Sequence, residues 1–143
     1  MSNENWLDKM MRGEGDMPPH IRSLKLHTLR LQHWEEGATH CTWTLLPEHC
    51  TGMGFAFGGY LGCVADAVAV FTFATLPGDW TEWTHVTQDM RLVYFRPMPV
   101  GDYTVAGRLV NRTRTSAFIE VDVTNADGKL CCRATLLEQL RPR

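Results

Sequence analysis

A long apolar stretch in the first half of the chain limits most strongly how the chain can fold. From Gly52 through Gly78 the only acid or base is Asp66, which is surrounded by residues such as Val64 and Val68. A helix built from this stretch has no polar face. It must therefore be buried on every side, either in a membrane or in a protein core that wraps around it.

The membrane alternative is the weaker of the two. A membrane-spanning helix needs about 20 consecutive apolar residues, and an aspartate at its centre costs about 3 kcal/mol. The stretch also has no Lys or Arg at its flanks to anchor it. The sequence favours a curved antiparallel sheet that encloses the helix, with a second subunit covering what one small sheet leaves open. We therefore expect a homo-oligomer and no membrane insertion.

Strand-like patterns lie on both sides of this helix. In the clearest of them, Ala117, Ile119, Val121 and Val123 alternate with polar residues, which indicates a strand with one buried face. Prolines and turn residues separate these segments. The expected strands cover residues 24–33, 39–46, 86–95, 103–111, 116–124 and 130–136. The sequence therefore predicts an α+β fold of about six strands around one long helix.

Length and composition restrict the class of protein further. The 143 residues fit a single domain, 1–143, in which residues 1–20 form an N-terminal tail or short helix. The net charge of −2 gives no basic footprint for nucleic acid. The first twenty residues carry no apolar run after a basic start, so we expect a cytoplasmic protein.

The cysteines and histidines show no metal-binding pattern. The five cysteines lack CxxC spacing, and the six histidines lack HxxxH or HExxH spacing. Free, buried thiols fit this set better than disulfides or metal ligands. We expect no metal site.

Two features of the apolar stretch are candidates for chemistry. Gly58 and Gly59 precede the helix and would leave unpaired backbone N–H groups at its positive end, where an oxyanion could bind. The simpler explanation is that these glycines only allow close packing. The residues alone do not decide the role of Asp66 either, since a lone acid on an apolar helix is either a hydrogen-bonded core residue or a functional carboxylate.

The segment FGGYLGCVADAVAV resembles the helix signature of PaaI-like (phenylacetic acid degradation type) hotdog thioesterases, in which a His-Gly-Gly is followed by apolar residues and an acid. The later segment THVTQDMRLVYFRPMPVGD is similar to the next strand of that family and its proline-containing turn. The resemblance covers roughly residues 20–140. It implies a hotdog fold, a dimer or dimer of dimers, and acyl-CoA sites built by two subunits.

The resemblance also implies roles for individual residues. Asp66 takes the position of the general base or nucleophile, Gly58 that of the amide which binds the thioester oxygen, and Thr87 that of a hydroxyl which assists the water. Two positions depart from the family pattern. Phe57 replaces the usual histidine and is expected to line the acyl pocket, while Thr51 stands near the usual asparagine and could orient water through its hydroxyl.

Further residues are expected to bind the substrate. Gly59 and Tyr60 lie beside Phe57 at the helix start, and Arg112 and Arg114 are candidates for the phosphates of coenzyme A, although turn arginines are more often simply solvated. Hydrolysis needs no cofactor, because CoA enters as part of the substrate. The identity of the acyl group is not specified by the sequence. Aromatic residues near the expected pocket hint at an aromatic or medium-chain acyl group; they are Phe55, Phe57, Tyr60, Trp80 and Trp83. The alternative function is a non-catalytic acyl-CoA-binding or regulatory hotdog module.

Overall fold

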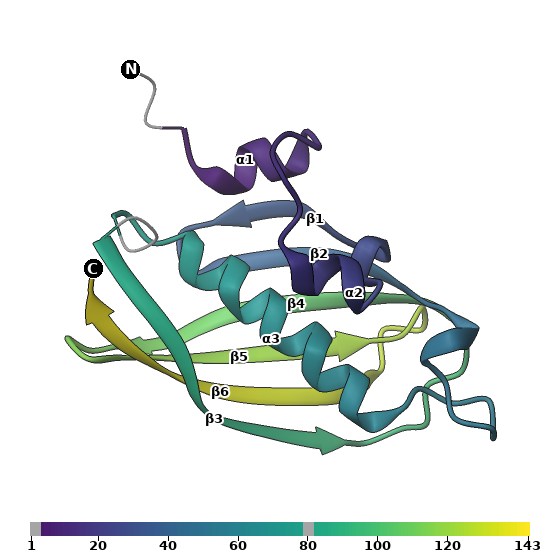
Figure 1. Cartoon of the computed structure of the whole chain (residues 1–143). Coiled ribbons are helices and arrows are strands. Elements are labelled where there is room, and N and C mark those ends of the chain that lie inside the picture. Colours follow the sequence, from purple (N-terminus) through teal and green to yellow (C-terminus); the bar gives the residue numbers. More distant parts are fainter. Residues whose placement is uncertain (1–3, 79–81) are drawn as a thin grey trace.

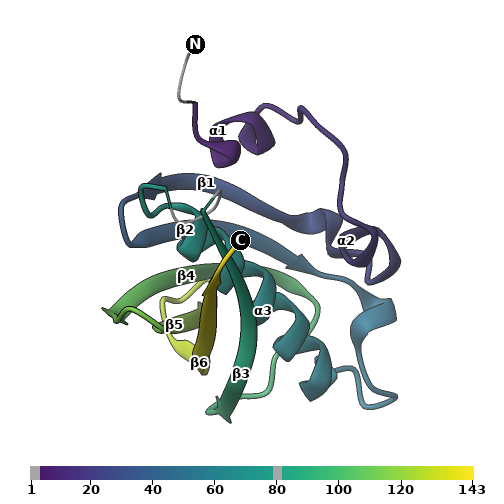
Figure 2. The same ribbon diagram turned by 60° about the vertical axis from the view of Figure 1, so that its left-hand side comes forward.

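A six-stranded antiparallel sheet curls around one long helix in the computed structural model, which describes residues 4–78 and 82–143 (Figures 1 and 2). The helix, α3, spans Gly58–Ala74. The strands are β1 (Leu29–Glu35), β2 (Ala38–Leu45), β3 (Trp83–Tyr94), β4 (Gly101–Arg112), β5 (Ser116–Thr124) and β6 (Leu130–Pro142). This is the α+β hotdog arrangement predicted from the sequence.

The order of the strands places α3 across the concave face of the sheet. The spatial order is β1-β2-β4-β5-β6-β3, so the chain forms the β1–β2 hairpin, crosses the sheet through α3, and enters β3 at the far edge. Strands β4, β5 and β6 then fill the middle as antiparallel neighbours. Strand β3 therefore lies beside α3 with only one strand neighbour, β6.

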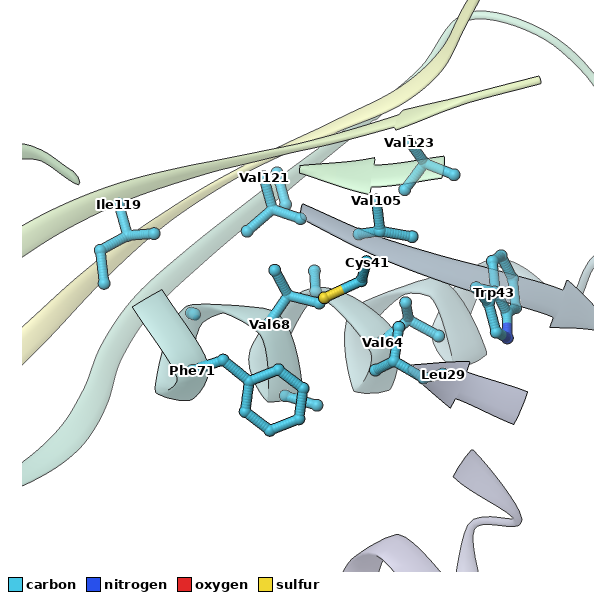
Figure 3. Packing of buried hydrophobic residues seen from close by; sticks show 14 of the residues in the cluster. Leu29, Cys41, Trp43, Val64, Val68, Phe71, Val105, Ile119, Val121 and Val123 are labelled. Atoms are coloured by element: carbon cyan, nitrogen blue, oxygen red, sulfur yellow. The ribbon is translucent and has the colours of Figure 1, made fainter. Parts of the chain in front are cut away.

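The apolar helix is buried as its sequence requires. Val64 and Val68 have no exposed surface, and in Figure 3 they lie beneath Val105 and Val121 of the sheet. The alternation predicted for β5 is confirmed, because Ala117, Ile119, Val121 and Val123 are all buried. Burial of apolar surface on both the helix and the sheet is the main stabilising contribution to such a core.

Gly107 of β4 allows α3 to approach the sheet closely. A β-carbon at Gly107 would lie 2.1 Å from Thr72 Oγ1 and 2.6 Å from Thr39 Oγ1. These two buried hydroxyls form a hydrogen bond of 2.8 Å with each other, and Thr72 also donates to the Val68 carbonyl. The absence of a side chain at Gly107 thus makes room for a satisfied polar contact between helix and sheet.

The N-terminal region differs in part from the prediction. It forms a short helix, α1 (Trp6–Met11), and α1 lies against β1 through a hydrogen bond from Trp34 Nε1 to Asp8 Oδ1 of 2.8 Å. The first strand, however, begins at Leu29 and not at Leu24, because Pro19 opens a second helix, α2 (Pro19–Ser23). A turn of 3-10 helix, η1 (Leu26–Thr28), links α2 to β1, and another, η2 (Pro47–His49), follows β2.

No helix within the described residues is long and apolar enough to cross a membrane. All five cysteines carry free thiols; Cys41, Cys131 and Cys132 are buried, and Cys50 and Cys63 are partly buried. No cluster of three or more His, Cys, Asp or Glu side chains suited to a metal ion occurs in the described part of the chain.

Candidate functional site

Asp66 and Thr87 meet at the boundary between α3 and β3. Asp66 is half-buried on the helix, and its Oδ1 accepts a hydrogen bond of 2.8 Å from Thr87 Oγ1 on the edge strand. The strand is irregular at this point, with a bulge between Thr87 and Asp89. Bulges re-aim side chains locally. The structure thus brings together two residues that lie 21 positions apart in the chain.

A second acid lies on the other side of Thr87. Glu138 of β6 is directly opposite Thr87 in the sheet, and its Oε1 lies 3.1 Å from Thr87 Oγ1. Its other oxygen, Oε2, is 3.7 Å from His85 Nδ1. Neither Glu138 nor His85 was predicted from the sequence. Extending the alternation of the last strand beyond Leu136 would have placed Glu138 on the inward face.

The start of α3 offers unpaired backbone donors. Its N-cap residue, Phe57, makes no side-chain capping bond, and the amides of Gly58 and Gly59 have no hydrogen-bond acceptor among the described residues. The carbonyl of Gly58 instead accepts a hydrogen bond of 2.7 Å from the Tyr94 hydroxyl. The amides at a helix start, together with the helix dipole, favour a negatively charged oxygen.

A cavity of about 390 Å³ opens at this end of the helix. It is lined mainly by apolar and aromatic side chains together with Gly58. Its largest lining residues are Phe55, Leu61, Tyr94, Phe95, Arg96 and Met98. The amide end of α3 therefore adjoins a space that suits an apolar group.

Gly58 and Asp66 cannot serve one reacting group within a single chain. They lie about two turns apart on the same straight helix, a separation of about 12 Å along its axis. A thioester carbonyl within hydrogen-bond reach of the Gly58 amide is out of reach of Asp66 of the same chain. A site that uses both residues needs two copies of the protein.

The remaining predicted residues at the helix start have varied surroundings. Phe57 is 59% exposed and its ring lies against Gly59. Thr51 is exposed in the preceding loop, where its Oγ1 accepts a bond from the Met53 amide. Tyr60 is buried, and burial raises the pKa of its phenol to about 12.

Tyr60 makes contacts that explain its burial. Its ring stacks on His49 with centroids 3.8 Å apart and planes 5° from parallel, and its hydroxyl donates to the Leu24 carbonyl at 2.9 Å. These contacts give Tyr60 a packing role that fixes α2 to the helix start. Its predicted contact with substrate remains a prediction.

Arg112 and Arg114 lie at the turn between β4 and β5, which Figure 1 shows at the C-terminal end of α3. The Arg112 guanidinium lies 5.1 Å from the ring centre of Trp83, and Arg114 is exposed. Within one chain, both are at the opposite end of the helix from Gly58. Trp80, another aromatic residue of interest, lies outside the described residues.

Comparison with known proteins places the chain in a family. The profile of the Thioesterase superfamily matches residues 53–132, more than half of the chain, and this match includes the whole of α3 and β3. The protein therefore belongs to the thioesterase superfamily, and the resemblance noted in its sequence is confirmed.

Solved structures share the fold over nearly the whole chain. A phenylacetic acid degradation-related protein from Ralstonia eutropha is 23% identical, with 94% of this chain and 99% of that chain covered at a TM-score of 0.80. Zebrafish thioesterase superfamily member 2 is 22% identical, with 96% and 95% covered and a TM-score of 0.80. A hypothetical thioesterase of Streptococcus pneumoniae, solved with coenzyme A, is 20% identical, with 86% and 98% covered and a TM-score of 0.74.

A shorter match links the chain to a protein of Saccharolobus solfataricus that carries a provisional esterase name. The two are 33% identical over 49 residues. This segment is 34% of the present chain and 35% of the relative, so the match spans about a third of the length of that protein.

Proposed function

We propose that the protein is a thioesterase that hydrolyses an acyl-CoA to the free acid and coenzyme A, at a site shared between two copies of the chain. The observation that carries this proposal is the hydrogen bond between Thr87 and Asp66, because it orients the single acid of an otherwise apolar helix. Membership of the thioesterase superfamily supports the same reaction class.

The second copy is expected to pair with β3. This strand is an edge of the sheet, and its exposed apolar residues include Val86, Met90, Val93 and Tyr94. The other edge, β1, is covered by α1. Two antiparallel β3 strands related by a two-fold axis would run in opposite directions, and this brings the helix start of one copy toward the middle of the other. Gly58 of one copy would then face Asp66 of the other.

In the proposed reaction, Asp66 acts as a general base. One carboxylate oxygen is fixed by Thr87, and the other accepts a proton from water as the water oxygen bonds to the thioester carbon. The Gly58 amide of the second copy donates to the carbonyl oxygen as it becomes negative. The carbon–sulfur bond then breaks, sulfur takes the proton from Asp66, and the products are RCOOH and HSCoA.

Two related structures support the choice of substrate class. The Streptococcus pneumoniae thioesterase was solved with coenzyme A, and a protein of Streptococcus mutans was solved bound to acetyl-CoA. We propose that this protein also takes an acyl-CoA, with the acyl group in the apolar cavity beside Gly58. No cofactor enters the proposed reaction.

One observation favours a second candidate function. Phe57 occupies the position where the family usually has histidine, and its exposed ring has no hydrogen-bonding group. A chain that lost catalysis with this histidine would bind acyl-CoA without hydrolysing it. The retention of Asp66 in a half-buried, hydrogen-bonded position favours the enzyme instead.

The experiment that tests the proposal measures thiol release from a panel of short-chain, long-chain and aryl acyl-CoAs. Because the protein has five free thiols, the signal of the protein alone is subtracted, and acid formation is checked by mass spectrometry. We expect release from at least one class. Binding of acyl-CoA without release from any of them would favour the binding module.

A further inference from the structure

Glu138 is the only acid that is fully buried among the residues the structure describes. Its side chain is 1% exposed and stands between Leu136 and Leu140 in the inward-facing row of β6. The neighbouring position on β5 is Ala117, which is also buried. A carboxylate in such an apolar row is costly unless another group satisfies it.

Two polar side chains of the described residues contact Glu138: Thr87 and His85. Oε1 is within hydrogen-bond distance of Thr87 Oγ1, at 3.1 Å. Oε2 has no hydrogen-bond partner in the described part of the chain; His85 Nδ1, at 3.7 Å, lies within ion-pair range but beyond hydrogen-bond distance. Thr87 is therefore the group to which Glu138 is directly bonded.

The two contacts of the Thr87 hydroxyl require two hydrogen atoms, and the hydroxyl supplies only one. A threonine hydroxyl has a single hydrogen, yet Thr87 lies between two carboxyl groups, Asp66 at 2.8 Å and Glu138 at 3.1 Å. Both contacts are full two-centre hydrogen bonds only if one carboxyl also carries a hydrogen. Glu138 is the more deeply buried of the two, so a negative charge is less favourable there than on half-buried Asp66.

We propose that Glu138 carries a proton, donates it to Thr87 Oγ1, and so directs the Thr87 hydrogen toward Asp66. Glu138 is then a positioning residue. An ionised Glu138 would instead compete for the same hydrogen and place a second negative charge near Asp66. The benefit to catalysis rests on the proposed thioesterase function, whereas the location of the proton does not.

Within residues 4–78 and 82–143, few other titratable groups face this chain of hydrogen bonds. Helix α3 contributes Asp66 and, beside it, Cys63, and strand β3 contributes His85. The residues of β5 that are packed nearby, Ala117 and Ile119, are apolar. A proton detected here can therefore be assigned by replacing one carboxyl at a time.

Infrared spectroscopy at neutral pH, where exposed acids are ionised, locates the proton without any measurement of activity. We expect wild type to show a carboxylic-acid carbonyl band that Glu138→Gln removes and Asp66→Asn keeps. Glu120→Gln is the matched control, because Glu120 is paired with Arg108 outside the site and should not contribute to the band. Absence of the band from wild type, or its loss in Asp66→Asn with retention in Glu138→Gln, would overturn the proposal.

Kinetics then test the positioning role. The amide of Glu138→Gln can still donate to Thr87, whereas Glu138→Leu cannot, so the leucine variant should lose roughly three- to tenfold in kcat with little change in KM. The glutamine variant should recover most of that loss. Thermal unfolding separates this role from a structural one, because leucine suits the apolar row and should leave Tm unchanged or raised. Equal losses in both variants, or a fall in Tm that parallels kcat, would contradict the role.

If wild type releases no thiol from any acyl-CoA, the proposed function fails while the infrared result still decides where the proton lies. If thiol is released but the carboxylic-acid band is absent, the thioesterase function is supported and the proposed proton on Glu138 is refuted.

Discussion

The ring of Phe57 lies against Gly59, with its Cε1 3.0 Å from the point that a β-carbon on Gly59 would occupy. The side chain that replaces the family's histidine thus lies over the first turn of α3, next to the amides proposed to bind the thioester oxygen. This contact makes Phe57 the residue to test first for acyl selectivity.

Phe57→Ala should change which acyl groups are accepted. Removal of the exposed ring enlarges the entrance, so preference should shift toward bulkier acyl groups, and KM for the original substrate should rise because about 1–3 kcal/mol of apolar contact is lost. Catalysis should survive in part, since the Gly58 amide and Asp66 remain. Values of kcat and KM on short, long and aryl acyl-CoAs provide the check.

Phe57→His tests the opposite case. If the family's histidine is required, wild type is inert and this variant should create thiol release. Unchanged acyl selectivity in an active Phe57→Ala protein would remove Phe57 from the acyl pocket.

Asp66→Asn should lower kcat by about two to four orders of magnitude while the fold is preserved. The amide oxygen of asparagine can still accept the Thr87 hydrogen bond, but the side chain cannot take a proton from water. Steady-state kinetics measure the loss, with circular dichroism and light scattering as controls for fold and assembly. Wild-type turnover in this variant would show that Asp66 is structural.

Thr87→Ser and Thr87→Val form a matched pair for the hydroxyl. Serine keeps the donor to Asp66 and valine keeps the shape without it, so serine should retain most of kcat while valine loses roughly tenfold. Equal activities of the two variants would show that the hydrogen bond has no part in catalysis.

Complementation between two inactive variants tests the shared site. Gly58→Pro removes the amide hydrogen at the first helical position, where proline is tolerated, and Gly58→Ala adds a similar β-carbon but keeps the hydrogen. Mixing Gly58→Pro with Asp66→Asn subunits should restore about a quarter of wild-type activity, because half the dimers are hybrids and each hybrid has one intact site.

The controls for this experiment are the assembly state and the alanine variant. Light scattering of wild type should show a dimer or tetramer at micromolar concentration, and Gly58→Ala should stay far more active than Gly58→Pro. No recovery after the two variants exchange subunits would contradict a site built from two copies, and so would a stable, active monomer.

Gly107→Ala should destabilise the fold by about 1–3 kcal/mol. The new methyl group would collide with the bonded hydroxyls of Thr39 and Thr72, so helix and strand must separate or the buried bond must break. Gly52→Ala is the control, because a β-carbon there meets nothing within 4 Å. Chemical denaturation of both variants measures the difference; equal stabilities would show that α3 adjusts freely.

Cys63 should report the charge of Asp66. Burial raises the pKa of this thiol, and the negative charge of Asp66 raises it further. The raised pKa leaves less thiolate at a given pH, so alkylation should be slow and should accelerate only as the pH rises. In Asp66→Asn the smaller, electrostatic part is removed, the pKa falls, and alkylation at fixed pH should be faster. Peptide mass spectrometry follows Cys63 alone, and an unchanged rate would place Asp66 too far away to act on it.

Much of this fold could be predicted because the signals are local. The apolar run that includes Val64 and Val68 required a wrapped helix, and the alternation through Ile119 and Val121 marked a strand with one buried face. The start of β1 could not be placed, because Pro19 is compatible either with the end of one helix or with the first turn of the next.

The residues that the structure brings together at the candidate site were predicted only in part. Asp66 stood out because nothing else near it in sequence is charged. Glu138 was not predicted, because the inward alternation was followed only to Leu136 and an acid on a strand is rarely buried. The contact between Thr87 and Glu138 depends on the pairing of β3 with β6, which no local pattern specifies.

The open edge of β3 also bears on what happens to the chain soon after synthesis. If the proposed dimer forms, a folded subunit that has not yet bound its partner has unpaired backbone groups along β3 beside Val86 and Val93, and such an edge can template unwanted strand addition and aggregation. Two exposed charged side chains on the same strand, Asp89 and Arg91, disfavour such strand addition. Replacing them with apolar residues should therefore reduce the yield of soluble protein when the chain is produced rapidly.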